Sequence, residues 1–267
     1  MQRNELRELA AFAQELCDLA DRATLPRFRR SIAVANKDRA GGFDPVTEGD
    51  KAAEKAIRAA IRKRYPSHGI LGEEFGNDDA AASLRWVIDP IDGTRAFIIG
   101  MPLWGTIIGL TRDGEPVLGA MSQPFTGERF WSEPGRARWR QGEGKPRILR
   151  SRPCASLDQA VLTSTHPDLF AAGEEMQRFQ ALKGRVRMTR FGGDCYGYCL
   201  LAAGYVDLVV EAGLKPYDII GLIPILEAAG GIVTTWDGRP ATDGGRILAA
   251  GDARLHAKAM AVLSGAK

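Results

Sequence analysis

Two aspartates lie three positions apart in the segment WVIDPIDGTRAF, at Asp89 and Asp92. An apolar run precedes Asp89, and Pro90 has no amide hydrogen to donate, so we expect a strand to end near Asp89 and a tight turn to bring both carboxylates together. Such carboxylates repel each other unless a proton or a cation lies between them. Magnesium prefers oxygen ligands, and the main-chain carbonyl of Ile91 is available between the two acids. The segment predicts a magnesium site, and a plain turn is the alternative.

The next residues add an anion site to this prediction. If a helix begins near Thr94, the amides of Gly93, Thr94 and Arg95 point toward a negative group, as they do at phosphate-binding helix ends. A metal site and a phosphate site would then adjoin.

Three other segments also place acids at the ends of expected elements. LGEE (residues 71–74) ends a strand, and KPYD (215–218) precedes a helix. TEGD (47–50) places Thr47 and Asp50 at a helix start, where they suit the holding of a water molecule, and a simple helix cap is the alternative.

Motifs for other chemistries are missing from the sequence. It has no GxSxG elbow, no GxxxxGK[ST] loop and no GxGxxG after a strand, and its three histidines are widely spaced. These absences leave serine–histidine hydrolysis and histidine–zinc chemistry without support, whereas chemistry based on acidic oxygens remains.

Composition indicates an ordinary globular chain. It has 267 residues, of which 45% are hydrophobic and 26% charged, and its formal net charge is +3. The N-terminal segment is amphipathic rather than apolar, and no run is long enough to span a membrane, so we expect a cytoplasmic protein. The basic segments 27–30 and 136–140 are too short to indicate a nucleic-acid partner.

Helical and strand patterns alternate along the chain, which predicts stacked layers of helices and sheets. Helices are expected over residues 1–16, 50–65, 169–182, 195–203 and 219–229. Strands are expected over residues 70–74, 85–88, 100–110, 116–122, 128–132, 161–163, 206–211 and 232–235. A seam near Ser151 divides the chain into residues 1–150, with most of the metal carboxylates, and residues 151–267, with Asp218 and the substrate side.

The acidic segments resemble the magnesium-dependent inositol monophosphatase superfamily. The matching segments are DPVTEGD (44–50), GEE (72–74), DPIDGT (89–94) and KPYD with the helix ending EAAGG (215–231), in the family's order. This resemblance implies an α/β fold, a five-layered αβαβα sandwich of the inositol monophosphatase and fructose-bisphosphatase type. It also implies a homodimer, inhibition by lithium, and a small phosphorylated metabolite as the substrate.

The resemblance also implies a role for each matching residue. Two or three magnesium ions would be held by Glu73, Asp89, Asp92, Asp218 and the carbonyl of Ile91. Asp50 and Thr94, beside the metal-bound Glu73, would orient and activate the attacking water. The main-chain amides of Gly93 and Thr94 would hold the phosphate. Asp44, Glu48 and Glu74 are expected to be solvated or to support these ligands.

Four segments favour one branch of the superfamily. DGTRAF (92–97), PLWGT (102–106), GGDCY (192–196) and VVEAGLKPYD (209–218) resemble the histidinol-phosphate phosphatases. Asp194 and Glu211 could offer carboxylates to the ammonium group of histidinol phosphate, and Arg95 replaces a residue of the inositol pattern. These three residues are therefore predicted to bind substrate, although Asp194 could instead cap the following helix.

Two other functions stay open. One is the hydrolysis of inositol phosphate or another small phosphate ester by the same chemistry. The other is a metal-binding regulator without turnover, which the pairing of Thr94 with Asp50 disfavours.

Overall fold

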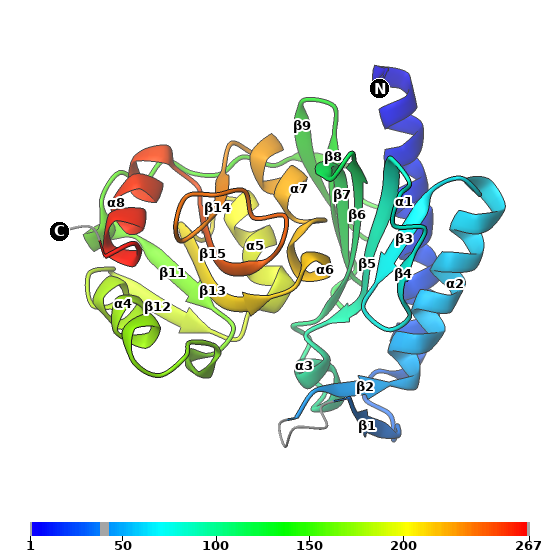
Figure 1. The fold of residues 1–267 in the computed structure, drawn as a ribbon, viewed down its shortest axis with the longest axis horizontal. Coiled ribbons are helices and arrows are strands. Elements are labelled where there is room, and N and C mark those ends of the chain that lie inside the picture. The colour runs from blue at the N-terminus through cyan, green and yellow to red at the C-terminus, as the bar shows by residue number, and fades with distance from the viewer. Residues whose placement is uncertain (1, 38–42, 266–267) are drawn as a thin grey trace.

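Two β-sheets alternate with three layers of helices (Figure 1). The computed structural model describes residues 2–37 and 43–265. The larger sheet has eight strands in the order β10-β9-β8-β7-β6-β5-β3-β4, and the smaller has five in the order β12-β11-β13-β15-β14. The predicted α/β sandwich of five layers is confirmed.

The strands of the larger sheet are β3 (Gly69–Gly72), β4 (Gly76–Asp78), β5 (Leu84–Asp92), β6 (Gly105–Arg112), β7 (Glu115–Gln123), β8 (Glu128–Glu133), β9 (Arg136–Gln141) and β10 (Arg147–Ile148). Those of the smaller sheet are β11 (Val161–Ser164), β12 (Met188–Phe191), β13 (Leu208–Leu214), β14 (Ile232–Thr235) and β15 (Gly245–Ala250). A separate antiparallel pair joins β1 (Val34–Asn36) to β2 (Pro45–Thr47).

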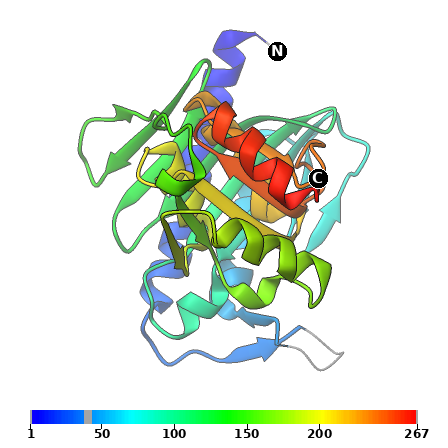
Figure 2. The ribbon, with the colours of Figure 1, turned by 90° about the vertical axis from the view of Figure 1, so that its left-hand side faces the viewer.

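Helices cover both faces of each sheet. The amphipathic helices α1 (Arg3–Thr24) and α2 (Glu48–Arg64) pack on the outer face of the larger sheet and bury a shared apolar cluster there. The helices α4 (Glu174–Lys183) and α8 (Ala253–Leu263) lie side by side over the smaller sheet (Figure 2). No helix in the described part of the chain has the length and apolar character of a membrane span.

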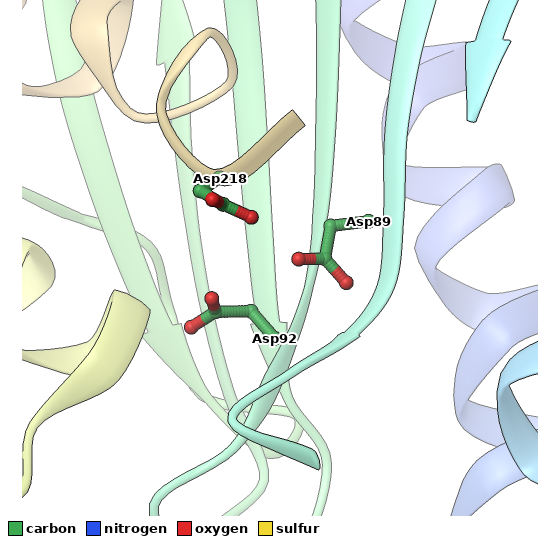
Figure 3. A group of neighbouring side chains, drawn as sticks. All are labelled: Asp89, Asp92 and Asp218. Atoms are coloured by element: carbon green, nitrogen blue, oxygen red, sulfur yellow. The ribbon is translucent and has the colours of Figure 1, made fainter. Parts of the chain in front are cut away.

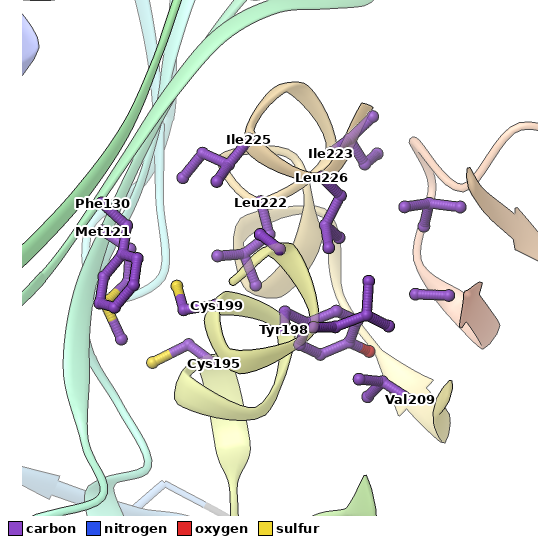
Figure 4. Packing of buried hydrophobic residues seen from close by; sticks show 14 of the residues in the cluster. Met121, Phe130, Cys195, Tyr198, Cys199, Val209, Leu222, Ile223, Ile225 and Leu226 are labelled. Carbon is purple, nitrogen blue, oxygen red and sulfur yellow. The ribbon is translucent and has the colours of Figure 1, made fainter. Parts of the chain in front are cut away.

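The central layer lies between the sheets and contains α5 (Asp194–Ala202), α6 (Pro216–Ile219) and α7 (Ile223–Ala228). Its apolar side chains, including Cys199, Leu222 and Leu226, fill the space between the sheets, with Met121 and Phe130 on the larger sheet (Figure 4). This layer matters for function because α5 and α6 bring residues of the second half of the chain against the first.

The single helix predicted over residues 219–229 is wrong, because the chain breaks into α6 and α7 around Gly221. A Cβ at Gly119 would lie 1.8 Å from the carbonyl oxygen of Gly221, and one at Gly109 would lie 2.9 Å from its nitrogen. The backbone at the break therefore rests directly on the backbone of the larger sheet.

Other boundaries also differ from the predictions. The strand predicted from residue 100 begins at Gly105, because the short helix α3 (Thr94–Ile98) and a turn come first. The helix predicted from residue 169 begins at Glu174, after a 3₁₀ turn (Pro167–Leu169) and Gly173, whose φ is +99°. β9, β12, β15 and α8 were not predicted, although the buried residues of α8, Leu255, Ala259 and Leu263, recur every four positions as in a helix.

Candidate active site

A β-bulge places Asp89 and Asp92 on the same side of β5. Residues three apart on a regular strand face opposite sides of the sheet. Asp89 pairs with Ile107 and Asp92 with Gly105, so β5 has one more residue than β6 in this interval. The prediction that the strand ends at Asp89 is wrong, because the bulge accommodates Pro90 and the strand continues to Asp92.

Hydrogen bonds hold the bulge in shape. The amide of Ile91 donates to Asp89 Oδ1 over 3.0 Å, and the hydroxyl of Thr106 donates to the carbonyl of Pro90 over 2.8 Å. On the far side, the amide of Cys195 donates to Asp92 Oδ2 over 2.6 Å, which joins β5 to the first turn of α5.

Asp218 completes a group of three aspartates. It lies on α6, where its Oδ2 accepts the amide hydrogen of Lys215 over 2.6 Å. Asp89, Asp92 and Asp218 each offer a carboxylate oxygen, and these oxygens lie within 4.8 Å of one another (Figure 3). The fold thus brings together residues that are more than a hundred positions apart.

No positively charged side chain of the described residues compensates the charges of these aspartates. Burial raises the pKa of Asp89, and the charges of Glu73, Asp92 and Asp218 raise it further. Burial and then the charge of Asp194 raise the pKa of Asp92 to about 8. Within the described ranges, none of the three aspartates forms an ion pair with a lysine or an arginine. An all-oxygen set with excess negative charge fits a hard divalent cation.

Glu73 lies beside this group, in the turn after β3. Its amide donates to the carbonyl of Ile88 over 3.2 Å, and its carboxylate is close enough to Asp89 to raise the pKa of that residue. A lysine also binds there, because Lys37 Nζ lies 2.7 Å from Glu73 Oε1 and 2.8 Å from Glu74 Oε1. Glu74 is buried rather than solvated, with 2% of its side chain exposed.

Asp50 is both a helix cap and a buried acid with an unused oxygen. Its Oδ2 accepts the amide and the hydroxyl of Thr47, over 2.8 and 2.5 Å, in a capping box at the start of α2. Its Oδ1 is buried and has no hydrogen-bond partner among the residues that the structure describes. Burial raises the pKa of Asp50 to about 6, and the charge of Glu73 contributes. An orphaned buried oxygen of this kind is suited to accept a hydrogen bond from a water molecule.

The helix predicted near Thr94 begins there, and Gly93 precedes it with φ of +81°. The hydroxyl of Thr94 donates to the carbonyl of Ile91 over 3.0 Å, so both residues lie at the bulge. The first amides of α3 lie outside the helix's own hydrogen-bond ladder and are suited to a phosphate oxygen.

A pocket of about 160 Å³ adjoins the aspartates. Its lining includes Asp92, Asp218, Asp194, Glu211 and Thr165. The pocket therefore has Asp92 and Asp218 of the aspartate group in its lining and, in addition, the acids Asp194 and Glu211.

Asp194 is the first residue of α5 and has φ of +44°, in the left-handed region. The helix cap is Gly193, and among the described residues the α5 start has no side-chain capping bond, so the capping alternative for Asp194 is wrong. Burial and the charge of Glu211 raise the pKa of Asp194 to about 7. Glu211 is itself committed within the protein, because its oxygens accept hydrogen bonds from Thr165 (2.9 Å from the amide nitrogen) and from the Tyr198 hydroxyl (3.0 Å).

Arg95 is not among the residues that line this pocket. Its guanidinium donates to the carbonyl of Phe43 over 2.6 Å, and its positive charge lowers the pKa of Asp194. It is thus within electrostatic range of the predicted substrate carboxylates.

Comparison with known proteins identifies the family. A model of the inositol monophosphatase family matches residues 5–266. The chain belongs to this family. It is 38% identical to the "Bifunctional phosphatase IMPL2, chloroplastic" of Arabidopsis thaliana, over 96% of this chain and 75% of that protein. It is 35% identical to a histidinol-phosphatase of Mycobacterium tuberculosis, over 86% of this chain and 90% of that protein.

Solved structures of the inositol monophosphatase family also match. An inositol monophosphatase from Zymomonas mobilis is 39% identical, with a TM-score of 0.85 over 97% of this chain and 98% of that one. Together with the phosphatase relatives, this establishes the chain as a phosphoric monoester hydrolase of the inositol monophosphatase superfamily.

Several residues that contact the candidate site were not predicted from the sequence. They are Lys37, Thr165 and Tyr198, together with the amide of Cys195. Each acts through a contact with a residue far away in the sequence, and no local motif marks it.

Proposed function

We propose that this phosphatase hydrolyses histidinol phosphate with the help of Mg²⁺. Asp89, Asp92 and Asp218 would hold the metal, and Glu73 and the carbonyl of Ile91 would extend the site to two or three ions. The observation that carries the metal part is the convergence of three carboxylates, one buried and two partly buried, without a cationic partner among the described residues. When bound, Mg²⁺ lowers the pKa of a water ligand and neutralises phosphoryl oxygens.

The chain's own groups then position the reactants. Asp50 Oδ1, which has no partner in the described part of the chain, accepts a hydrogen bond from the attacking water, which the hydroxyl of Thr94 also orients. The amides of Gly93 and Thr94 hold the phosphate beside the bulge. Such positioning replaces covalent catalysis in phosphoryl transfer.

Two observations support histidinol phosphate as the substrate. Asp194 presents a carboxylate to the pocket without using it as a helix cap, and Glu211 adds charge behind it. A substrate ammonium group complements this charge, whereas a neutral polyol does not. Relatives named histidinol-phosphatase match at 34–36% identity over most of the chain. Inositol phosphate is the second candidate, since an "Inositol-1-monophosphatase ImpA" matches at 29% identity over 97% of the chain.

The remaining predictions belong to the same proposal. A homodimer and inhibition by lithium rest on the family resemblance, and a cytoplasmic location rests on the sequence pattern. The division of the chain at residues 150 and 151 also stays a prediction.

Phosphate release from histidinol phosphate and inositol 1-phosphate, with Mg²⁺ and with excess EDTA, tests the proposal. We expect turnover only with Mg²⁺ and a preference for histidinol phosphate. Full activity in EDTA would contradict the metal mechanism, and a preference for inositol phosphate would contradict only the substrate. Binding of Mg²⁺ without release of phosphate from either ester would favour a non-catalytic regulator.

The variant Asp194→Asn examines the substrate more closely, because asparagine tolerates the same left-handed backbone. Loss of a charge-assisted hydrogen bond of about 1.5 to 3 kcal/mol lowers kcat/KM for histidinol phosphate by about ten- to a hundredfold. Inositol phosphate should be affected far less. Equal losses on both substrates would exclude a role of Asp194 in substrate selection.

A further inference from the structure

Two charged residues on α2, Glu54 and Arg58, are buried next to the turn that carries Glu73. Glu54 is 0% exposed and Arg58 6%. Arg58 Nε donates to Glu54 Oε1 over 2.7 Å, one helical turn along α2. A buried ion pair is a poor means of adding stability, because desolvation offsets the attraction between the charges. The other contacts of the pair are therefore informative.

Both oxygens of Glu54 accept main-chain hydrogen bonds from the turn between β3 and β4. The amide of Glu74 donates to Oε2 over 2.8 Å, and the amide of Phe75 donates to Oε1 over 3.2 Å. Arg58 extends the contact by donating from Nη2 to the carbonyl of Gly76. The three residues that follow Glu73 are thus each tied to α2.

The sequence also leaves room for this carboxylate. A Cβ at Gly72 would lie 1.9 Å from Glu54 Oε1 and 2.3 Å from its Cδ. A side chain at residue 72 would displace the carboxylate from the turn. The absence of a side chain at Gly72 therefore allows the Glu54 carboxylate to contact the backbone on both sides of Glu73.

We propose that Glu54 is a positioning residue for metal binding: it fixes the backbone around Glu73 so that the Glu73 carboxylate faces Asp89. This proposal rests on the proposed function, in which Glu73 extends the metal site. Glu54 does not belong to the group of Asp89, Asp92 and Asp218, and it acts only through the turn. Its loss weakens Mg²⁺ binding while the three aspartates stay in place.

The variant Glu54→Gln tests this role. A glutamine places an NH₂ group opposite the amide of Glu74 and loses the charge that pairs with Arg58. Asp207→Asn is the matched control, because Asp207 is also a buried carboxylate (1% exposed) that binds an arginine, Arg152, and a main-chain amide, that of Val161. The direct measurement is the dissociation constant of Mg²⁺ from the substrate-free protein by titration calorimetry. Phosphate release is then followed as a function of Mg²⁺ concentration.

We expect Glu54→Gln to raise the Mg²⁺ dissociation constant by about ten- to a hundredfold, the usual effect of groups that orient a metal ligand. Saturating Mg²⁺ should restore most of kcat, and Asp207→Asn should bind Mg²⁺ like the wild type. A wild-type constant in folded Glu54→Gln, or equal shifts in both variants, would overturn the proposal. If Glu54→Gln does not fold, the variant Arg58→Lys takes its place, because it keeps the positive charge but loses the hydrogen bond to Gly76. An increase in its Mg²⁺ dissociation constant supports the proposal, and a wild-type dissociation constant overturns it. A wild-type protein that binds no Mg²⁺ would instead refute the proposed function.

Discussion

Two groups of acids contact the larger sheet, and they differ in where their positive charge comes from. Asp18 and Asp21 on α1 pair with Arg129 on β8, with nitrogen–oxygen distances of 2.9 and 2.8 Å. Arg129 is 6% exposed, and Ser122 also donates to Asp21. Asp89, Asp92 and Asp218 form the other group, and in the described residues no arginine or lysine pairs with them.

The difference separates a structural group from a binding group. Where the chain supplies the cation, the acids join α1 to the sheet whether or not a ligand is present. Burial raises the pKa of Asp21 too, but the charge of Arg129 opposes that shift. Among the described residues no lysine or arginine opposes it for Asp89, Asp92 and Asp218, so this group is suited to an external cation. The comparison predicts opposite responses of the two groups to the same kind of substitution.

The largest difference should appear on removal of one carboxylate charge. Asp89→Asn or Asp92→Asn should lower kcat by roughly 10²- to 10³-fold, the effect of losing one electrostatic contact to a transition state. The metal-free variants should be at least as stable as the wild type, because a buried charge has been removed. Asp21→Asn should keep kcat and lose stability. Kinetics with Mg²⁺ measure kcat, and thermal melts in EDTA measure the stability of the metal-free variants. Near-normal kcat in a folded Asp92→Asn variant would show that the site is misplaced.

Removal of the arginine examines the structural group. Arg129→Met leaves Asp18 and Asp21 without their buried partner and should lower the free energy of unfolding by about 3 kcal/mol. Urea unfolding measures this change. The Mg²⁺ dependence of the folded variant should stay that of the wild type. If Arg129→Met is as stable as the wild type, the ion pairs of Arg129 with Asp18 and Asp21 do not stabilise the fold, and the contrast between the two groups fails.

Magnesium should stabilise the protein more at high pH than at low pH. A carboxyl group whose pKa is higher in the folded than in the unfolded protein stabilises the fold below its unfolded pKa, and this stability is lost as the pH rises through the folded pKa. For Asp92 the interval runs from 3.8 to about 8, so the metal-free protein should weaken across it. Mg²⁺ at about 100 times its dissociation constant should add about 2.7 kcal/mol.

Thermal melts with Mg²⁺ and with EDTA at pH 5.5 and 8.5 make this comparison. Protons compete with the metal at the lower pH, so the increase in Tm should be larger at pH 8.5. An increase that does not depend on pH would contradict the raised pKa values of the aspartates. Asp89→Asn should show a much smaller increase at both values.

The sequence made the chemistry of the site predictable because that chemistry is local. Asp89, Pro90 and Asp92 lie within four residues, and the start of α3 at Thr94 follows from the same segment. The bulge itself was missed, because its register depends on the pairing of β5 with β6. The contact of Lys37 with Glu73 and the break at Gly221 were missed for the same reason, since each depends on the packing of distant segments.

The contact of Gly221 with Gly109 and Gly119 bears on how such a site can change over time. It sets α6, and with it Asp218, against the larger sheet through main-chain atoms, without a side chain as a spacer. Substitutions in the apolar core can therefore accumulate while the separation of the three aspartates is preserved. Asp194 lies on α5, which contacts the site through the amide of Cys195 and Asp92 Oδ2 and not through this glycine contact. The position of Asp218 relative to β5 and β6 thus depends on the absence of side chains at residues 109, 119 and 221.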